Sequence, residues 1–339
     1  MRILITPDSF KGTYSSPEVA AAVGTGVAAA GATPVPLPVA DGGEGTFTAL
    51  CQTLRAQIVE VPSRNPWGVP LTAGIGMTPD GTAIVELAQA SGITVPHDGP
   101  RDPVAASTYG TGMLISAAVH YGARKILVAA GGSATTDGGA GAVQAIEDGG
   151  GLGDASIVVL SDVTTTFTDA AKIFGPQKGA DPAMVELLTA RLQEQAREFP
   201  QDPTGVARTG AAGGFSGGLW AHYGAELVSG ADYILDAIAF DTRLREADAV
   251  VVGEGRLDSQ TGEGKIIEAI LRRVRRDERE LPVIAIVGSV SEDLGAYAEN
   301  FAQIIVATDD AAMARAGRTL VGTLQSWAAS SPTAGGVTI

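Results

Sequence analysis

Residues 125–147 read KILVAAGGSATTDGGAGAVQAIE, and this stretch decides the predicted fold. Lys125–Ala130 is a short, mainly apolar run, Gly131–Gly139 holds only small or polar residues, and a helical pattern follows to about Glu147. An apolar run that leads through a glycine-rich loop into a helix is typical of a strand in a parallel sheet, which helices cover on both faces. The stretch therefore predicts one strand–loop–helix unit of an α/β protein.

The same order recurs along the chain. The other predicted strands with such loops are Arg2–Thr6, Val35–Val39 and Asp248–Val252, and the loops after them are Pro7–Thr13, Ala40–Gly45 and Gly253–Thr261. Further predicted elements are a helix with a capping box at Ser15 and Glu18, an outer helix at Asp181–Phe199, strands at Pro282–Val287 and Gln303–Ala307, and a closing helix at Ala312–Ala329. Since 339 residues exceed the usual size of one small domain, we predict two α/β domains with mainly parallel sheets. Ligands of such sheets bind beyond the carboxyl ends of the strands, where these loops lie.

Composition narrows the function. The net charge of −15, with no basic run, excludes a face that neutralises nucleic-acid phosphates. Cys51 is the only cysteine, which suits a reducing compartment. The apolar start is too short for a signal peptide, and no apolar run approaches the ~18 residues of a membrane span, so we expect a cytoplasmic protein without a membrane partner.

Two N-terminal loops carry charged residues at predicted helix starts. Asp8 and Lys11 stand in the first, where a lysine can reach a phosphate and a carboxylate can hold a metal or accept a hydroxyl proton; the alternative is a surface ion pair. Asp41 and Glu44 stand among three glycines in the second, where glycine permits close approach of a ligand; the alternative is a helix cap.

The two later loops have the composition of phosphate and metal sites. The candidates for a phosphate cradle in the loop after residue 130 are Gly131, Gly132, Ser133, Thr135, Gly138 and Gly139. Glu254 and Asp258 are candidate Mg²⁺ ligands, and Arg256 suits a bidentate phosphate contact, although the three also suit a structural salt-bridge cluster. The chain lacks the Walker A motif and a strand-linked G-x-G-x-x-G, and its three histidines are scattered. The loops alone therefore predict an enzyme that acts on a phosphorylated or anionic small molecule.

Ten short motifs in this order resemble the type 1 family of bacterial glycerate kinases. They are Pro7–Gly12, Val39–Thr46, Glu86–Gly92, Arg101–Pro103, Thr108–Gly112, Gly131–Thr135, Asp137–Gly141, Phe174–Ala180, Gly210–Gly214 and Gly253–Thr261. They span nearly the whole chain, and together they are specific.

The resemblance implies ATP, Mg²⁺ and glycerate as reactants, and two α/β domains with the active site in the cleft between them. Residues 1–80 plus 280–339 are expected to form a discontinuous Rossmann- or flavodoxin-like domain, and residues 81–279 an inserted α/β domain. The chain departs from the family pattern in a short link between Glu147 and Ile157, in a turn at Asp162–Thr166 that lacks Asn-Pro, and in Ile266 where a proline is common. The subunit number, including a homo-oligomer, stays open.

The resulting hypothesis assigns a role to each candidate. The loop at Gly131–Gly139 is expected to cradle the nucleotide phosphates, Glu254 and Asp258 to bind Mg²⁺ directly or through water, and Lys11 and Arg256 to neutralise the transferred group. The candidates that orient the hydroxyl group and accept its proton are Asp8, Asp41 and Asp137, and those that contact glycerate are Ser9, Lys11, Arg64, Arg101 and Lys178. Two alternatives remain: a kinase for another small hydroxy acid, and a sensor that binds glycerate or nucleotide without turnover.

Overall fold

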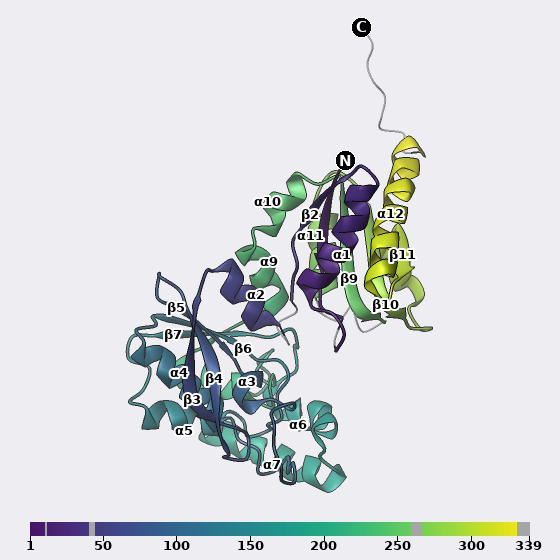
Figure 1. Cartoon of the computed structure of the whole chain (residues 1–339). Helices are drawn as coiled ribbons and strands as arrows, with labels where there is room; N and C mark the ends of the chain where they lie inside the picture. Colours follow the sequence, from purple (N-terminus) through teal and green to yellow (C-terminus); the bar gives the residue numbers. More distant parts are fainter. Residues whose placement is uncertain (11, 41–44, 259–265, 331–339) are drawn as a thin grey trace. The chain divides into compact units, whose positions relative to one another are not determined.

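The computed structural model describes residues 1–10, 12–40, 45–258 and 266–330, and it shows two α/β units. One unit comprises Met1–Ala40 and Ile238–Ile339, and the other comprises Asp41–Ala237 (Figure 1). Each unit has its own sheet, in which most neighbouring strands run parallel, as the strand–loop–helix pattern predicts.

The predicted domain boundaries at residues 80 and 280 are wrong. Strands β3 (Gln57–Arg64) and β4 (Pro70–Met77) pair antiparallel with each other, and β4 pairs antiparallel with β5 (Thr82–Glu86), so all three belong to one sheet of the second unit. Strand β9 (Ala249–Leu257) pairs with β1 (Arg2–Pro7) in the sheet of the first unit. The two compact units divide after Ala40 and before Ile238 instead.

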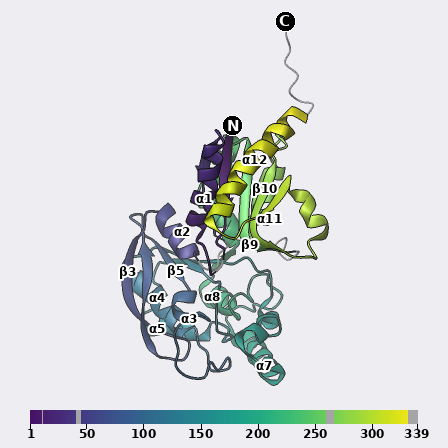
Figure 2. The ribbon, with the colours of Figure 1, turned by 45° about the vertical axis from the view of Figure 1, so that its right-hand side comes forward.

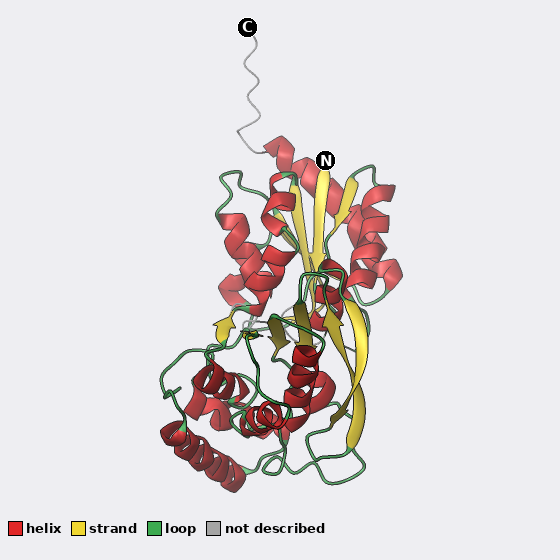
Figure 3. Cartoon of the chain, turned by 90° about the vertical axis from the view of Figure 1, so that its left-hand side faces the viewer, coloured by secondary structure: helices red, strands yellow, loops and turns green. Residues whose placement is uncertain are grey.

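The first unit is a doubly wound parallel sheet with the order β11-β10-β9-β1-β2. Its remaining elements are α1 (Ser16–Ala29), β2 (Thr33–Pro36), α10 (Phe240–Arg245), α11 (Ile266–Arg275), β10 (Val283–Val290), the 3₁₀ helix η4 (Gly295–Asn300), β11 (Gln303–Val306) and α12 (Asp310–Ser330). Figure 3 shows helices on both sides of these strands. The strand order reverses between β1 and β9, and ligands of such sheets bind beyond the carboxyl ends of the strands at this point.

Helices α1 and α12 pack side by side on one face of this sheet (Figures 1 and 2). They approach closely because Gly26 lacks a side chain, and a Cβ atom there would lie 1.9 Å from the carbonyl oxygen of Ala314. The predicted capping box is present, since the Ser15 amide donates to Glu18 Oε2 at 2.8 Å.

Two predicted strands differ in extent. The predicted strand Val35–Val39 is β2 at Thr33–Pro36, an edge strand, and the amides of Leu37 and Val39 beyond it still donate to Ile5 and Pro7 at 2.7 and 3.0 Å. Strand β9 continues through Leu257, so Glu254 and Arg256 lie on a strand rather than in the predicted loop. Strand β10 extends beside it, with Ser289 opposite Arg256, and this pairing keeps the segment extended.

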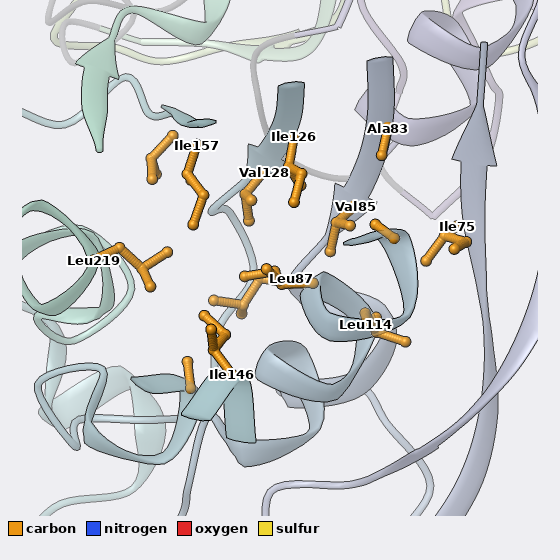
Figure 4. Packing of buried hydrophobic residues seen from close by; sticks show 14 of the residues in the cluster. Ile75, Ala83, Val85, Leu87, Leu114, Ile126, Val128, Ile146, Ile157 and Leu219 are labelled. Atoms are coloured by element: carbon orange, nitrogen blue, oxygen red, sulfur yellow. The ribbon is translucent and has the colours of Figure 1, made fainter. Parts of the chain in front are cut away.

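The second unit has a mixed sheet with the order β3-β4-β5-β6-β7-β8, in which β5 to β8 are parallel. Its other elements are α2 (Thr46–Thr53), α3 (Ala88–Ser91), α4 (Tyr109–His120), β6 (Lys125–Ala129), α5 (Ala140–Asp148), β7 (Ser156–Leu160), η1 (Phe167–Asp169), α6 (Ala170–Phe174), η2 (Pro176–Lys178), α7 (Pro182–Glu198), α8 (Phe215–Tyr223), β8 (Glu226–Val228) and α9 (Gly230–Ala237). Leu114 of α4, Ile146 of α5 and Leu219 of α8 pack with the apolar side chains of the strands (Figure 4). No helix in the described ranges has the length and apolar character needed to span a bilayer.

Candidate functional site

The loop after β6 is tied to the segment that follows α3. Gly132 accepts a hydrogen bond from the amide of Ile93 at 2.9 Å, and the amide of Ala134 donates to Ser91 at 2.9 Å. Gly132 has a φ of +69°, which a residue with a side chain rarely adopts. Gly131 and Gly132 are at least partly exposed, whereas residues 133–139 are buried. The first two glycines are therefore the part of the loop that a ligand can approach.

Asp137 fixes this loop to the start of α4. Its side chain is 7% exposed, and Oδ2 accepts hydrogen bonds from the amide of Thr108 at 2.7 Å and from its hydroxyl at 2.8 Å. The amides of Gly139 and Gly141 also donate to the carboxylate, each at 3.2 Å. Four donors within the protein occupy this carboxylate, so we infer that Asp137 positions the loop instead of accepting a proton from a substrate.

Lys178 supports the same loop from inside the unit. Its Nζ atom donates to Ser133 Oγ at 2.9 Å and to the carbonyl oxygen of Thr135 at 2.5 Å, and the residue is 8% exposed. Burial lowers the pKa of Lys178 to about 7, while the charge of Asp137 opposes this shift. The lysine thus holds the loop in shape, and its ammonium group is already engaged.

Gly138 and Gly139 serve close packing. A Cβ atom at Gly138 would lie 2.1 Å from Gln195 Oε1 of α7, and one at Gly139 would lie 2.9 Å from the carbonyl oxygen of Phe215 of α8. The buried hydroxyl group of Thr135 has no hydrogen-bond partner among the described residues, and the same holds for Thr136. The predicted cradle is thus a compact loop with an exposed glycine pair at its start.

Of the other two predicted cations of this unit, Arg101 lies near the loop after β6 and Arg64 does not contact it. Arg101 donates to the carbonyl oxygens of Ile93 and, at 3.4 Å, of Val95, so it lies on the segment that pairs with the loop. Arg64 lies at the end of β3, where its guanidinium stacks 5.6 Å from the ring centre of Tyr109. Arg64 is therefore not among the contacts of the loop.

In the first unit, Asp8 lies at the end of β1, next to Gly253 of β9. Pro7 is opposite Gly253 in the parallel register, and the amide of Asp8 donates to the carbonyl oxygen of Gly253 at 2.8 Å. Asp8 thus lies just past the end of β1, beside the part of β9 where Glu254 follows Gly253. Asp8 is 6% exposed, and its Oδ1 accepts the amide of Ser9 at 2.6 Å.

This register tests the predicted magnesium ligands. Glu254 and Asp258 are four positions apart, and β9 is extended as far as Leu257. Their Cα atoms are therefore on the order of 13 Å apart, too far for both side chains to bind one ion directly. Asp8 directly follows β1 and Glu254 lies on the adjacent strand β9. Continuing the register would bring their Cα atoms to about 5 Å, so the two fit a shared cation better. No group of three or more potential metal-binding side chains occurs in the part of the chain that the structure describes.

The remaining candidates lie near this edge or outside the described residues. Arg256 is exposed, and its Nη2 atom is 3.5 Å from Ser291 Oγ, just after β10. Lys11 and Asp41 lie outside the described residues. The motif Thr108–Gly112 was recognised in the sequence, but not that Thr108 donates two hydrogen bonds to Asp137. Arg208, two residues before the motif Gly210–Gly214, was not among the predicted site residues.

Comparison with known proteins decides the family. Residues 3–148 and 150–329 match the model of the glycerate kinase family. The chain belongs to the glycerate kinase family. The matched residues include all four glycine-rich loops, and the class of chemistry is that of a kinase with an alcohol acceptor. The link between Glu147 and Ile157 is the turn between α5 and β7, where Gly150, Gly151 and Gly153 have positive φ angles.

Individual glycerate kinases are similar over most of their length. The chain is 37% identical to the glycerate kinase of Bacillus subtilis (strain 168) over 334 residues, which cover 87% of each protein. It is also 37% identical to the glycerate 2-kinase of Escherichia coli (strain K12) over 333 residues, again 87% of each. The solved structure of a putative glycerate kinase 2 from Salmonella typhimurium LT2 superposes with a TM-score of 0.82 at 33% identity, covering 97% of this chain and 99% of that one.

Proposed function

We propose that this chain transfers a phosphoryl group from ATP to a hydroxyl group of glycerate. The observation that carries the proposal is the loop after β6, in which buried Lys178 and Asp137 hold an exposed pair of glycines in a chain of the glycerate kinase family. Such preorganised backbone groups suit phosphate oxygens, because they need no rearrangement when charge develops. In this proposal Gly131 and Gly132 contact the nucleotide phosphates, and the buried Ser133 is held behind them by Lys178.

Magnesium would neutralise phosphate charge, and Asp8 and Glu254 are the residues that fit it. Support comes from the pairing of Pro7 with Gly253, because Asp8 and Glu254 directly follow these two residues at the switch point of the first sheet. Asp258 would act on the ion only through water, because its distance along the strand excludes direct binding together with Glu254.

The proton of the attacking hydroxyl group needs an acceptor. Of the three predicted aspartates, Asp137 is occupied by four hydrogen bonds, and Asp8 is assigned to the cation. Asp41 is then the remaining candidate for the base. Lys11 and Arg256 keep their proposed role of neutralising the transferred phosphoryl group.

A substrate panel tests this proposal. The purified chain is mixed with ATP, Mg²⁺ and one acid at a time, namely glycerate, tartronate or another small hydroxy acid, and ADP release is followed. We expect the highest kcat/KM for glycerate. A higher kcat/KM for another acid would reassign the substrate, and thermal stabilisation by glycerate without ADP release would indicate a sensor. The chain is also expected to act in the cytoplasm, as its composition predicts.

A further inference from the structure

The segment Arg208–Gly214 concentrates unusual backbone geometry. Arg208 has a φ of +72° and Ala212 one of +51°, and they are two of the four non-glycine residues with positive φ in the described part of the chain. Gly213 and Gly214 continue the segment with φ angles of +68° and +90°. Residues with side chains are held in this region only where the surroundings require it, and such positions cluster at functional sites.

The backbone of Arg208 is held from both sides. Its amide donates to the carbonyl oxygen of Thr164 at 3.2 Å, and its carbonyl oxygen accepts a hydrogen bond from Ser216 Oγ at 2.6 Å. Gly213 packs so closely against the loop after β6 that a Cβ atom would lie 2.0 Å from the carbonyl oxygen of Thr135. The segment is therefore fixed on the proposed phosphate loop.

The side chain of Arg208 lies at the carboxyl end of β7. Its Nη1 atom donates to the carbonyl oxygen of Ser161 at 2.5 Å, and Ser161 directly follows β7. The amide of Ala130 donates to Leu160 at 3.1 Å, so the residue after Ala130, Gly131, continues beside this same strand end. The guanidinium is thus anchored at the carboxyl end of β7, the strand that pairs with β6.

Arg208 uses fewer of its donors than the other cations of this region do. Lys178 donates to Ser133 and Thr135, and Arg101 donates to two carbonyl oxygens. Both Nη atoms of Arg191 donate to the carbonyl oxygen of Val104 at 3.0 Å. Arg208 is half-buried and has no carboxylate partner within the described residues, and one of its five N–H groups is bound by Ser161.

We propose that Arg208 binds an anionic oxygen group of a reactant, either the carboxylate of glycerate or a phosphate of the nucleotide. The planar guanidinium, anchored by one N–H group, presents its remaining donors in the geometry that matches a carboxylate or phosphate. This inference rests on the proposed function and adds a residue to it that the motifs alone do not assign.

The test uses Arg208→Asn, because asparagine tolerates positive φ and so leaves the backbone in place. Arg55→Asn is the matched control, since Arg55 is an exposed arginine with a φ of +54° at the end of α2. Calorimetry measures the binding of glycerate and, separately, of a non-hydrolysable ATP analogue to wild type and both variants. We expect Arg208→Asn to bind one of these two ligands about tenfold more weakly or worse, with an unchanged melting temperature. Arg55→Asn is expected to bind both ligands as wild type does.

The two arms separate the sources of the anion. Weaker glycerate binding alone assigns the carboxylate, and weaker binding of the analogue alone assigns a phosphate. Equal affinity of wild type and Arg208→Asn for both probes would overturn the inference while leaving the proposed function intact. Should Arg208→Asn melt at a lower temperature, Arg208→Lys keeps the charge without the planar fork, and unchanged affinity of that variant for both probes would overturn the inference as well. A wild-type chain that binds neither probe would overturn both.

Discussion

The Nζ atom of Lys178 lies 2.5 Å from the carbonyl oxygen of Thr135, within the buried part of the loop after β6. The contact links the 3₁₀ helix η2 to a loop more than 40 residues earlier in the chain, and it places a cation where water is excluded. Asp137 lies near enough to oppose the resulting pKa shift. The loop is thus shaped by a buried polar cluster, and its exposed glycines are free for a ligand.

This contact predicts how stability depends on pH. Burial lowers the pKa of Lys178 from 10.5 to about 7, so between these values the unfolded chain binds a proton that the folded protein has lost. The free energy of unfolding of wild type should therefore rise with pH relative to Lys178→Met, by up to about 1.4 kcal/mol per pH unit. Urea unfolding of both proteins at pH values between about 7.5 and 9.5 measures the difference. A difference independent of pH would show that Lys178 titrates alike in both states.

Asp137→Asn should destabilise the protein by about 3 kcal/mol, because an amide group replaces one of the oxygen atoms that accept buried hydrogen bonds. Asp154→Asn is the control, since Asp154 is exposed. Urea unfolding gives the stability and the ADP assay gives the turnover of each variant. A variant at position 137 with wild-type stability and no turnover would instead make Asp137 the catalytic base.

Gly213→Ala should destabilise by more than Gly205→Ala, although both glycines have a φ near +70°. At Gly213 the new Cβ atom would lie 2.0 Å from the carbonyl oxygen of Thr135, whereas at Gly205 nothing lies within 4 Å. We expect about 1 kcal/mol at Gly205 and at least about 3 kcal/mol at Gly213, measured by urea unfolding. Equal losses would mean that the segment does not pack firmly on the loop.

Substitutions at the carboxyl ends of β1 and β9 should distinguish residues that bind Mg²⁺ directly from those that do not. Asp8→Asn and Glu254→Gln are expected to raise the Mg²⁺ concentration needed for half-maximal activity by about tenfold, and Asp258→Asn by less, because only the first two can bind one ion directly. Activity titrated with Mg²⁺ at saturating ATP gives these values. If Asp258→Asn raised this Mg²⁺ concentration most, Asp258 would instead be a direct ligand of the ion.

Lys11→Ala should remove most of the turnover, because the proposed charge neutralisation of the transferred group would be lost. The melting temperature is expected to change little. Retained activity together with a large fall in melting temperature would make Lys11 a structural ion-pair partner.

The strand–loop–helix rhythm predicted the α/β class and most elements, because apolar runs and glycine clusters are local signals. The domain boundaries failed for a different reason: strands such as β3 and β9 join a sheet through distant partners, and no local pattern names the partner. The same limit applies to the site. Motifs identified the loop at Gly131–Gly139, but only the contacts show that Lys178 and Asp137 hold it from inside, and that Arg208 lies at the adjacent strand end.

Phosphorus NMR of one reaction tests the central claim most directly. Wild-type protein is incubated with ATP, Mg²⁺ and glycerate, and the spectrum is followed with time. The proposed function predicts a phosphate monoester of glycerate that appears in equal amount with ADP, and its coupling identifies the hydroxyl group that received the phosphoryl group. A spectrum in which ATP persists unchanged, or in which ADP appears only with inorganic phosphate, would contradict it.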